Sequence, residues 1–513
     1  MDALGIGFEV AAGMSRSSHL TAPAPLRARP FAAACLLAAL GLSACAMGGA
    51  RPADTRLPPA YDAPRGASAL AAEELDKWWL LFGDAQLNAL EDEAFRLSPD
   101  ARTAAARLLE AQATRASQTA QTFPQTELQG NANHKNTQNL DAGSNNLIPV
   151  GGTTISETLN FNVSWEIDLF GRLAIARKVA NADLAATRFN VEGSRAALAA
   201  NVADSYFQVR GLAIQLADAR ETVRIQTQLQ DIASRKAQLG LGAASDADRV
   251  AGDLAQARSN AESLEAELHA NQRTLLVLVG RGIDPVSAVT PTTVAGDVPA
   301  TPDSIPGDLL QRRPDIREAE AKVRSAAGRD RIAHRALFPT FTFQPSAGLS
   351  HLVSPGVTFI PPATLEPAQQ TTNTSFWAYG VGVSQPVLDV PRLLADMKTQ
   401  DARTEQAVIA YEKTVQTAFG EAENALVRLS ADQRRVALLK DGEARAHRAY
   451  DAARTRYAQG LDDLQTALGA EQSWRSTRSA LTAEQVQALR RAVQTYKALG
   501  GGWAYAARAG GAP

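Results

Sequence analysis

Residues 159–172 read LNFNVSWEIDLFGR, and the periodicity of the sequence changes within this stretch. From Leu159 to Leu169 every second residue is apolar and those between are polar, which is the period of a β-strand. From Arg172 the pattern is helical and continues to Gly240, a length of about 100 Å at 1.5 Å per residue. The stretch therefore predicts a strand that leads into a very long helix. We expect the transition at five residues, namely Trp165, Glu166, Asp168, Gly171 and Arg172.

A second alternating stretch lies in the other half of the chain. Trp377, Tyr379, Val381 and Val383 alternate with alanine and glycine. Segments of about ten residues with one apolar face and one polar or small face are typical of transmembrane β-strands. The alternative is a strand of a soluble sandwich, but the flanking helical patterns fit a sandwich poorly.

The chain also repeats itself. The segments Ser98–Pro124 and Arg313–Pro339 both carry a Pro-Asp pair at their second and third positions and end with Phe-Pro, with the two prolines 25 positions apart in each. The two copies are offset by 215 residues at first and later by 220, as in Gly240-Leu241 and Gly460-Leu461. The change of offset indicates a five-residue insertion in a stretch rich in loop residues, between Pro339 and Val383. We interpret the chain as a duplicated unit.

Each unit has the same predicted plan. A helix of about 25 residues ends at Phe-Pro, because proline cannot continue it. Two strands around a loop follow, and then a long helix, a glycine turn and a returning helix. The expected helical hairpins span about 172–279 and 393–499, with Gly193 and Gly211 as possible interruptions of the first. Both hairpins point to the same end of the molecule.

The composition supports long helices and excludes several classes of protein. Of 513 residues, 6% are aromatic and 45% hydrophobic, much of the latter alanine, which favours closely packed helices. No proline lies between Pro149 and Pro285 or between Pro391 and Pro513. The formal charge of −2 gives no electrostatic reason to expect a nucleic-acid partner, and such a composition does not favour disorder.

The N-terminal segment is typical of a signal peptide. Basic residues precede a twelve-residue apolar run, Phe31–Leu42, which is too short to span a membrane. The following Leu42-Ser43-Ala44-Cys45 resembles the lipobox of bacterial lipoproteins and predicts cleavage before Cys45, which is then acylated. An ordinary cleavage site is the alternative. Asp2 and Glu9 fit poorly in a signal peptide, so we hypothesise that translation starts at Met14. By resemblance to lipoprotein sorting rules, an aspartate after the cysteine would indicate retention in the inner membrane, so Ala46 favours the outer membrane.

The predicted strands are too few to close a barrel in one chain. Outer-membrane barrels of a single chain begin at eight strands, and open strand edges are not tolerated in lipid. Four strands per chain therefore predict an oligomer joined through its strands. Two copies would give eight strands and a filled interior, whereas three would give twelve and an aqueous channel, so a transport role favours three.

Several long motifs now point to a family. Residues 165–172 (WEIDLFGR), 310–316 (LQRRPDI), 456–461 (RYAQGL) and 498–503 (ALGGGW) resemble the signatures of outer-membrane efflux proteins of the TolC and OprM type, and the lipobox resembles the NodT-type lipoprotein branch. The resemblance implies a mixed α and transmembrane β fold. In it, a homotrimer builds a 12-stranded β-barrel in the outer membrane, continuous with a periplasmic α-helical barrel.

The same resemblance implies a function and partners. Such trimers dock to a periplasmic adaptor, or membrane fusion protein, and an inner-membrane pump, and pass drugs or other small molecules outward. Ducts of the same fold that serve type I protein secretion or metal efflux are alternatives. A lipid-anchored periplasmic coiled-coil scaffold is a further one, but it leaves the alternating strands unexplained. The sequence does not identify the substrate.

The expected division of the chain follows from these observations. It comprises the signal peptide (1–44), a lipidated linker (45–75), the first unit (76–284), an inter-unit linker (285–306), the second unit (307–503) and a tail (504–513).

The hairpin turns carry the candidate functional residues. By resemblance, carboxylates near the turns narrow the pore; the candidates for the tip and gate are Gly240, Asp246, Asp248, Gly460, Asp462 and Asp463. Asp246 and Asp463 have the alternative role of capping the returning helix. Gly469 stands where OprM-like members often have an aspartate, so the second unit offers only Asp462 and Asp463. The resemblance also makes Arg235, Arg456 and Tyr457 candidates for adaptor contact or gate pairing, with a solvated helix face as the alternative.

We expect no enzyme activity, cofactor or metal site. Glu166 and Asp168 resemble a hydrolase pair only superficially, because they continue a polar strand face that is expected to line the channel. The six histidines are scattered, and the sequence contains no nucleotide-binding loop or nucleophile elbow. Energy for transport must then come from partner proteins.

Overall fold

The computed structural model describes residues 51–63, 68–69, 75–138, 152–300, 302–303, 306–361 and 364–502. The predicted signal peptide, Met14, Cys45 and the tail 504–513 lie outside these residues. None of the described helices is long and apolar enough to cross a membrane.

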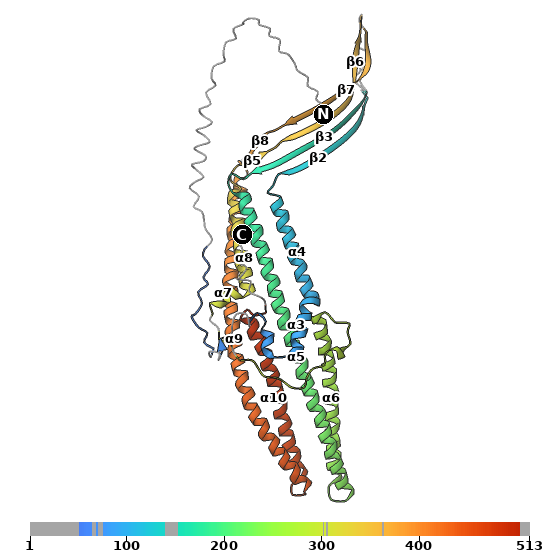
Figure 1. Ribbon diagram of the computed structural model, residues 1–513, viewed down its shortest axis with the longest axis vertical. Coiled ribbons are helices and arrows are strands. Elements are labelled where there is room, and N and C mark those ends of the chain that lie inside the picture. Colours follow the sequence, from blue (N-terminus) through green and yellow to red (C-terminus); the bar gives the residue numbers. More distant parts are fainter. Residues whose placement is uncertain are drawn as a thin grey trace, which may run out of the picture. The chain divides into compact units, whose positions relative to one another are not determined.

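Long helices dominate the described chain, as the periodicity predicts. The longest are α5 (Arg172–Gln238, 67 residues) and α9 (Val390–Ala458, 69 residues), which return as α6 (Ala244–Val279) and α10 (Leu464–Ala498). Each of the two long helices measures about 100 Å at 1.5 Å per residue. Both hairpin turns lie at the end of the helices that is remote from the sheet (Figure 1).

A shorter helix precedes the strands in each unit. These helices are α4 (Pro99–Ala120) and α8 (Pro314–Arg335), and each has its proline in the first turn, where a missing N–H costs nothing. Both end shortly before Phe-Pro, as expected. The remaining helices are short, namely η2 (Trp78–Phe82), α3 (Ala85–Leu97), η3 (Val286–Ala288) and α7 (Asp308–Arg312).

Helix α5 is continuous through both of its internal glycines. At Gly211 a Cβ atom would lie 2.8 Å from the Val486 side chain of α10, so this glycine permits a close approach of the two helices. At Gly193 the nearest atom, on Pro314, is 3.6 Å away. Neither glycine therefore interrupts the predicted helix, and at Gly211 the reason for glycine is packing.

The sheet is antiparallel and consists of β2 (Gln125–Thr137), β3 (Gly152–Ile167), β5 (Thr340–Phe343), β6 (Ser346–Ile360), β7 (Thr364–Ala378) and β8 (Val381–Ser384). Strand β2 lies at one edge and pairs with β3. Strand β3 pairs with β6 along most of its length and with the short β5 at its helix end. At the other edge β7 pairs with β6, and β8 pairs with β5. The four predicted strands are thus present, but two of them are interrupted, at Gln344-Pro345 and at Tyr379-Gly380. Pro345 has no N–H to give to the ladder.

One row of residues shows how the sheet separates apolar from polar side chains. Leu128, Phe161, Ala347 and Trp377 lie opposite one another on four neighbouring strands. Leu128 is 68% exposed and Trp377 is 77% exposed. The described helices extend away from one end of the sheet and none lies over it (Figure 1). The apolar face of the sheet is therefore uncovered within one chain.

The core lies among the helices, halfway along the hairpins. Trp78, Tyr206, Phe207 and Tyr496 are almost fully buried there among alanines, valines and leucines. The ring of Trp78 stacks on that of Tyr496 with centroids 6.0 Å apart. Two short strands, β1 (Ser68–Ala69) and β4 (Pro302–Asp303), pair in parallel and join the N-terminal segment to the inter-unit segment.

The N-terminal segment 51–63 follows α9. The Arg51 guanidinium binds the Glu412 carboxylate at 3.0 Å, and the Tyr61 ring stacks on Phe419 at 5.5 Å. Further along, the Asp62 N–H donates to Glu423 at 3.1 Å. The segment thus runs along α9 in the direction away from the sheet.

Candidate functional site

The two hairpin turns have the same local structure. Gly240 and Gly460 adopt positive φ angles of 71° and 75°, and a Cβ would meet nothing within 4 Å at either position. The next residue in each turn, Leu241 or Leu461, donates its N–H to the carbonyl five positions earlier, at 2.8 and 2.9 Å. This is the hydrogen-bond pattern of a Schellman helix end, which requires a left-handed residue. Glycine is needed here for its backbone conformation.

One contact joins the two hairpins near their turns. The Lys236 ammonium of α5 lies 3.9 Å from the centre of the Tyr457 ring of α9, and it also donates to the Tyr457 carbonyl at 3.5 Å. Tyr457 is buried, and burial, with the nearby Asp246 carboxylate of α6, raises the pKa of its hydroxyl. Tyr457 therefore contacts one arm of the first hairpin through Lys236, and the charge of Asp246 on the other arm influences its hydroxyl. No motif in the sequence marks Lys236, although it lies next to Arg235.

The predicted tip carboxylates have different surroundings. Asp462 forms an ion pair with Arg456 at 2.9 Å within the second turn. Asp463 caps α10 by accepting the Thr466 N–H at 2.7 Å, and hydrogen bonds from Thr466 lower its pKa. The capping role considered for Asp463 is thus confirmed.

The same role is wrong for Asp246. The residue before α6 is Ala243, which offers no capping side chain, and Asp246 lies inside the first turn of the helix. Its carboxylate is instead close enough to Tyr457 to affect it. Asp248 and Arg235 are exposed, and neither forms an ion pair with another described residue. The two turns thus differ, since only the second has an internal ion pair.

A buried polar contact lies behind the turns. The Gln226 amide of α5 donates to the Glu471 carboxylate of α10 at 2.8 Å, and both side chains are buried. Burial raises the pKa of Glu471, against the influence of Arg475, whose Nε is 3.2 Å away. The Tyr450 and Trp474 rings stack beside it at 5.1 Å. These residues link the hairpins, and no motif in the sequence marks them.

The strand-to-helix transition lies where the sequence predicts it. The Arg172 guanidinium binds the Glu166 carboxylate, with Nε 3.0 Å from Oε1. Gly171 precedes α5 with a φ of 76°. Strand β3 ends at Ile167, so Asp168 does not share a strand face with Glu166, and that expectation is wrong. Asp168 instead accepts the Ala174 N–H at 2.8 Å, which satisfies a free donor of the first turn of α5.

Aromatic side chains surround this transition. The Phe170 ring stacks on Phe338 at 4.9 Å, which joins the start of α5 to the end of α8. Trp165, Trp377 and Tyr379 are exposed, and the last two stack on each other at 6.2 Å. Exposed tryptophan and tyrosine at one end of a sheet are typical of the interface between a membrane and water.

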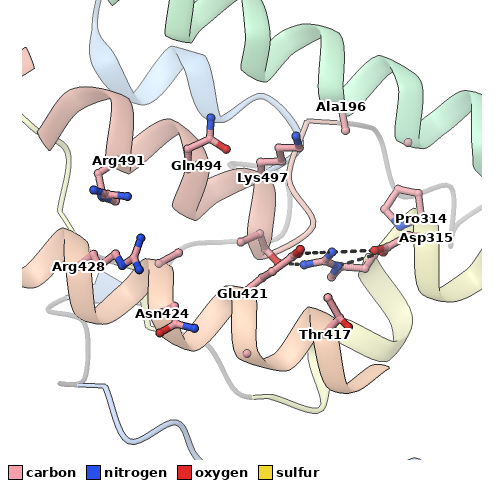
Figure 2. A pocket seen from close by; sticks show the side chains of 15 residues that line it. Ala196, Pro314, Asp315, Thr417, Glu421, Asn424, Arg428, Arg491, Gln494 and Lys497 are labelled. Carbon is pink, nitrogen blue, oxygen red and sulfur yellow. Dashed lines mark hydrogen bonds and ion pairs between the residues drawn. The ribbon is translucent and has the colours of Figure 1, made fainter. Parts of the chain in front are cut away.

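A cavity of about 810 Å³ lies where α8 meets α9 and α10 (Figure 2). Arg313, just before α8, binds Asp315 and Glu421 at 2.7 Å each and donates to the Ala498 carbonyl at 3.1 Å. These bonds satisfy its buried guanidinium and hold the three helices together. Arg313 belongs to the motif 310–316, whose role here is structural.

Comparison with known proteins agrees with this architecture. The family model described as outer membrane efflux protein matches residues 90–281 and again residues 305–501. The two matches coincide with the two halves of the duplicated sequence and cover most of the chain.

Individual relatives extend over almost the same region. The chain is 27% identical to the pyoverdine export outer membrane protein OpmQ of Pseudomonas aeruginosa over 84% of its own length and 88% of the relative. It is 28% identical to the antibiotic efflux pump outer membrane protein ArpC of Pseudomonas putida over 87% and 88%.

Among solved structures, the outer-membrane channel OprN superposes with a TM-score of 0.71 at 25% identity, over 89% of this chain and 98% of OprN. The fold, the duplicated family match and the motifs agree. The chain belongs to the outer membrane efflux protein family and is, as predicted, the outer-membrane channel of an efflux pump rather than an enzyme.

Proposed function

We propose that three copies of this chain close one 12-stranded barrel in the outer membrane, which continues into a periplasmic tunnel of helical hairpins. The observation that carries the proposal is the four-stranded width of the sheet, with β2 at one edge and β7 and β8 at the other. Unpaired strand edges are not tolerated in lipid. Three copies give twelve strands, which leave an aqueous channel, whereas two give a filled interior.

The uncovered face of the sheet supports its position in lipid. The row Leu128, Phe161, Ala347 and Trp377 is apolar, and its exposed side chains find no cover within the described chain. The opposite face of β3 carries polar residues such as Asn160 and Asn162. Lipid on the first face and water on the second satisfy both sets of side chains.

The hairpin turns are the proposed periplasmic gate and docking surface. Lys236 and Tyr457 join the two hairpins, and Arg456 with Asp462 fixes the second turn. Exposed Arg235 and Asp248 are free to meet an adaptor. We propose that an adaptor and an inner-membrane pump engage this end, because the channel itself carries no energy-consuming site among its described residues.

Lipid attachment at Cys45 is proposed from the sequence and from the path of the segment that follows. Arg51 binds Glu405 and Glu412, which follow the start of α9 at Val390 by about 22 and 33 Å along the helix. Cys45 precedes Arg51 by six positions, a length of chain that can span at most about 20 Å. This reach is comparable to the distance from Glu405 to the sheet end of α9, where the membrane surface is expected.

The cargo is proposed to be small molecules. The relatives OpmQ and ArpC carry the names of a pyoverdine exporter and an antibiotic efflux component, which differ chemically. Because channels of this family serve such different molecules, we propose that the channel provides only the route outward and that the pump selects the molecule to be exported.

Conductance of the purified protein in planar bilayers tests the proposal. The wild-type channel is expected to be mostly closed, and Lys236→Gln is expected to raise its conductance, because the contact between the hairpins is lost. Tyr457→Phe is the matched control, since it keeps the ring and the carbonyl that Lys236 contacts. A protein that never conducts in any of these forms would refute the channel. Equal conductance of Lys236→Gln and Tyr457→Phe would refute the gate.

A further inference from the structure

Two helices bring an imidazole and two carboxylates together near the sheet. Asp330 and His334 lie one turn apart in the last part of α8, and Asp401 lies in α9. One ligand atom from each residue lies within 4.8 Å of those of the other two. Imidazole nitrogens and carboxylate oxygens are ligands of Zn²⁺ and similar divalent cations. No other such group occurs among the residues that the structure describes.

The Asp330 carboxylate is the buried member of this cluster. The residue is 8% exposed, and its buried Oδ1 makes no hydrogen bond to the described part of the chain. The nearest basic atom is His334 Nδ1, at 3.4 Å, which also lies 3.0 Å from the Asp330 carbonyl. Burial and the adjacent Asp401 raise the pKa of Asp330, while His334 and Arg331 act in the opposite direction. A buried carboxylate next to a second one needs a positive partner or a shared proton.

The other unit of the chain has different side chains at the equivalent positions. The offsets of the repeat, 215 in the short helices and 220 in the long ones, place Asp330, His334 and Asp401 opposite Arg115, Thr119 and Asn181. There the Arg115 guanidinium donates to the Asn181 amide oxygen at 2.8 Å, and the Thr119 hydroxyl donates to the Arg115 carbonyl at 2.8 Å. The first unit thus joins its helices with an arginine from the chain itself. At the equivalent positions the second unit has an acid where the first has this cation, a second acid where the first has asparagine, and a histidine where the first has threonine.

We propose that Asp330, His334 and Asp401 bind one divalent transition cation of the Zn²⁺ class, which joins α8 to α9 next to the sheet. Two carboxylates and one imidazole are three protein ligands, which leave a fourth position for water. Bonds to zinc are about 2.0–2.2 Å long, so the ligand atoms must approach one another by about 1 Å, which side-chain rotation of the exposed Asp401 provides. The ion supplies the positive charge that Arg115 supplies in the first unit.

Metal titration of the full-length, untagged protein tests this site. After removal of metal with a chelator, calorimetry with Zn²⁺ is expected to show one tight site per chain, and Co²⁺ should give visible absorption bands characteristic of nitrogen and oxygen ligands. Asp330→Arg combined with Asp401→Asn rebuilds the arginine–asparagine pair of the first unit and should fold but lose the site. His334→Thr, the residue of the first unit, should weaken binding by about ten-fold or more and change the Co²⁺ spectrum.

Asn181→Ala is the control, because it breaks the corresponding bond of the first unit without touching the proposed ligands. It should bind Zn²⁺ as the wild type does. Wild-type protein without a stoichiometric site would overturn the proposal and favour a proton shared by the two acids. Zn²⁺ binding and Co²⁺ spectra that are unchanged in His334→Thr would also overturn it, even if the double variant does not fold.

Discussion

The helical hairpins and the sheet satisfy their side chains in different ways. The hairpins bury tyrosine, tryptophan and leucine within one chain, and even the buried Glu471 has a partner in Gln226. The sheet leaves Leu128 and Trp377 exposed and both of its edges unpaired in one copy. The difference teaches that the hairpins contain most of what they need to pack, whereas the sheet needs the further copies and the lipid that we propose for it.

The largest expected effect concerns the sheet. Leu159→Arg puts a charge on the apolar face of β3, opposite Leu349 and further from the aromatic end of the sheet than the row of Trp377, where a charge costs up to about 2–4 kcal/mol per chain, enough to prevent assembly. Asn162→Arg, on the opposite face of the same strand, should leave assembly intact. The yield of assembled protein in outer membranes measures both. Equal yields from the two variants would contradict the assigned faces.

A packing change in the hairpins should have a smaller effect. Gly211→Ala puts a methyl group 2.8 Å from Val486 and is expected to destabilise the protein by about 1–3 kcal/mol. Gly442→Ala in α9 has only an ordinary contact at 3.7 Å, so it should stabilise by about 0.5–1 kcal/mol, as alanine does in a helix. Chemical unfolding followed by circular dichroism compares them, and effects of the same sign would contradict the close approach of α5 and α10.

The buried Glu471 predicts a pH dependence of stability. Its pKa is raised above 4.5 in the folded chain, so the folded state holds this proton more tightly than the unfolded state. Stability from this group is then greatest below pH 4.5 and decreases as the pH rises through the folded value. Glu471→Gln should flatten that decrease, whereas Glu262→Gln, on an exposed helix face, should not. Melting temperatures measured between pH 5 and 8 give the change of stability with pH for each variant. The same change in wild type and Glu471→Gln would argue against the burial effect.

The smallest effect on stability is expected at the second turn. Asp462→Asn breaks an ion pair with Arg456, whose side chain is 60% exposed, and pairs with such an exposed member contribute about 0–1 kcal/mol. The melting temperature should therefore hardly change. A drop comparable to that of Gly211→Ala would show that the turn stabilises the hairpin far more than its exposure suggests.

The sequence predicts the regular parts of this molecule well, because they depend on local patterns. The length of α5 and α9, the proline-started helices and the glycine turns all follow from periodicity and backbone conformation. The interruption at Pro345 and the roles of Asp168 and Asp246 were missed or misassigned, since they depend on where an element ends to within a residue or two.

Contacts between distant segments could not be predicted in this way. Lys236 and Tyr457 are far apart in the sequence, as are Gln226 and Glu471, and only the packing of the hairpins brings them together. The cluster at His334 left a partial signal, an aspartate one helical turn before the histidine. Its third member, Asp401, lies in another helix beyond the intervening strands.

The number of chains in the assembled channel tests the central claim most directly. Native mass spectrometry of the protein extracted from outer membranes counts the copies that complete the sheet. We predict three chains, whose twelve strands leave an open channel. A complex of two chains, or a single chain that stays folded in the membrane, would contradict this account.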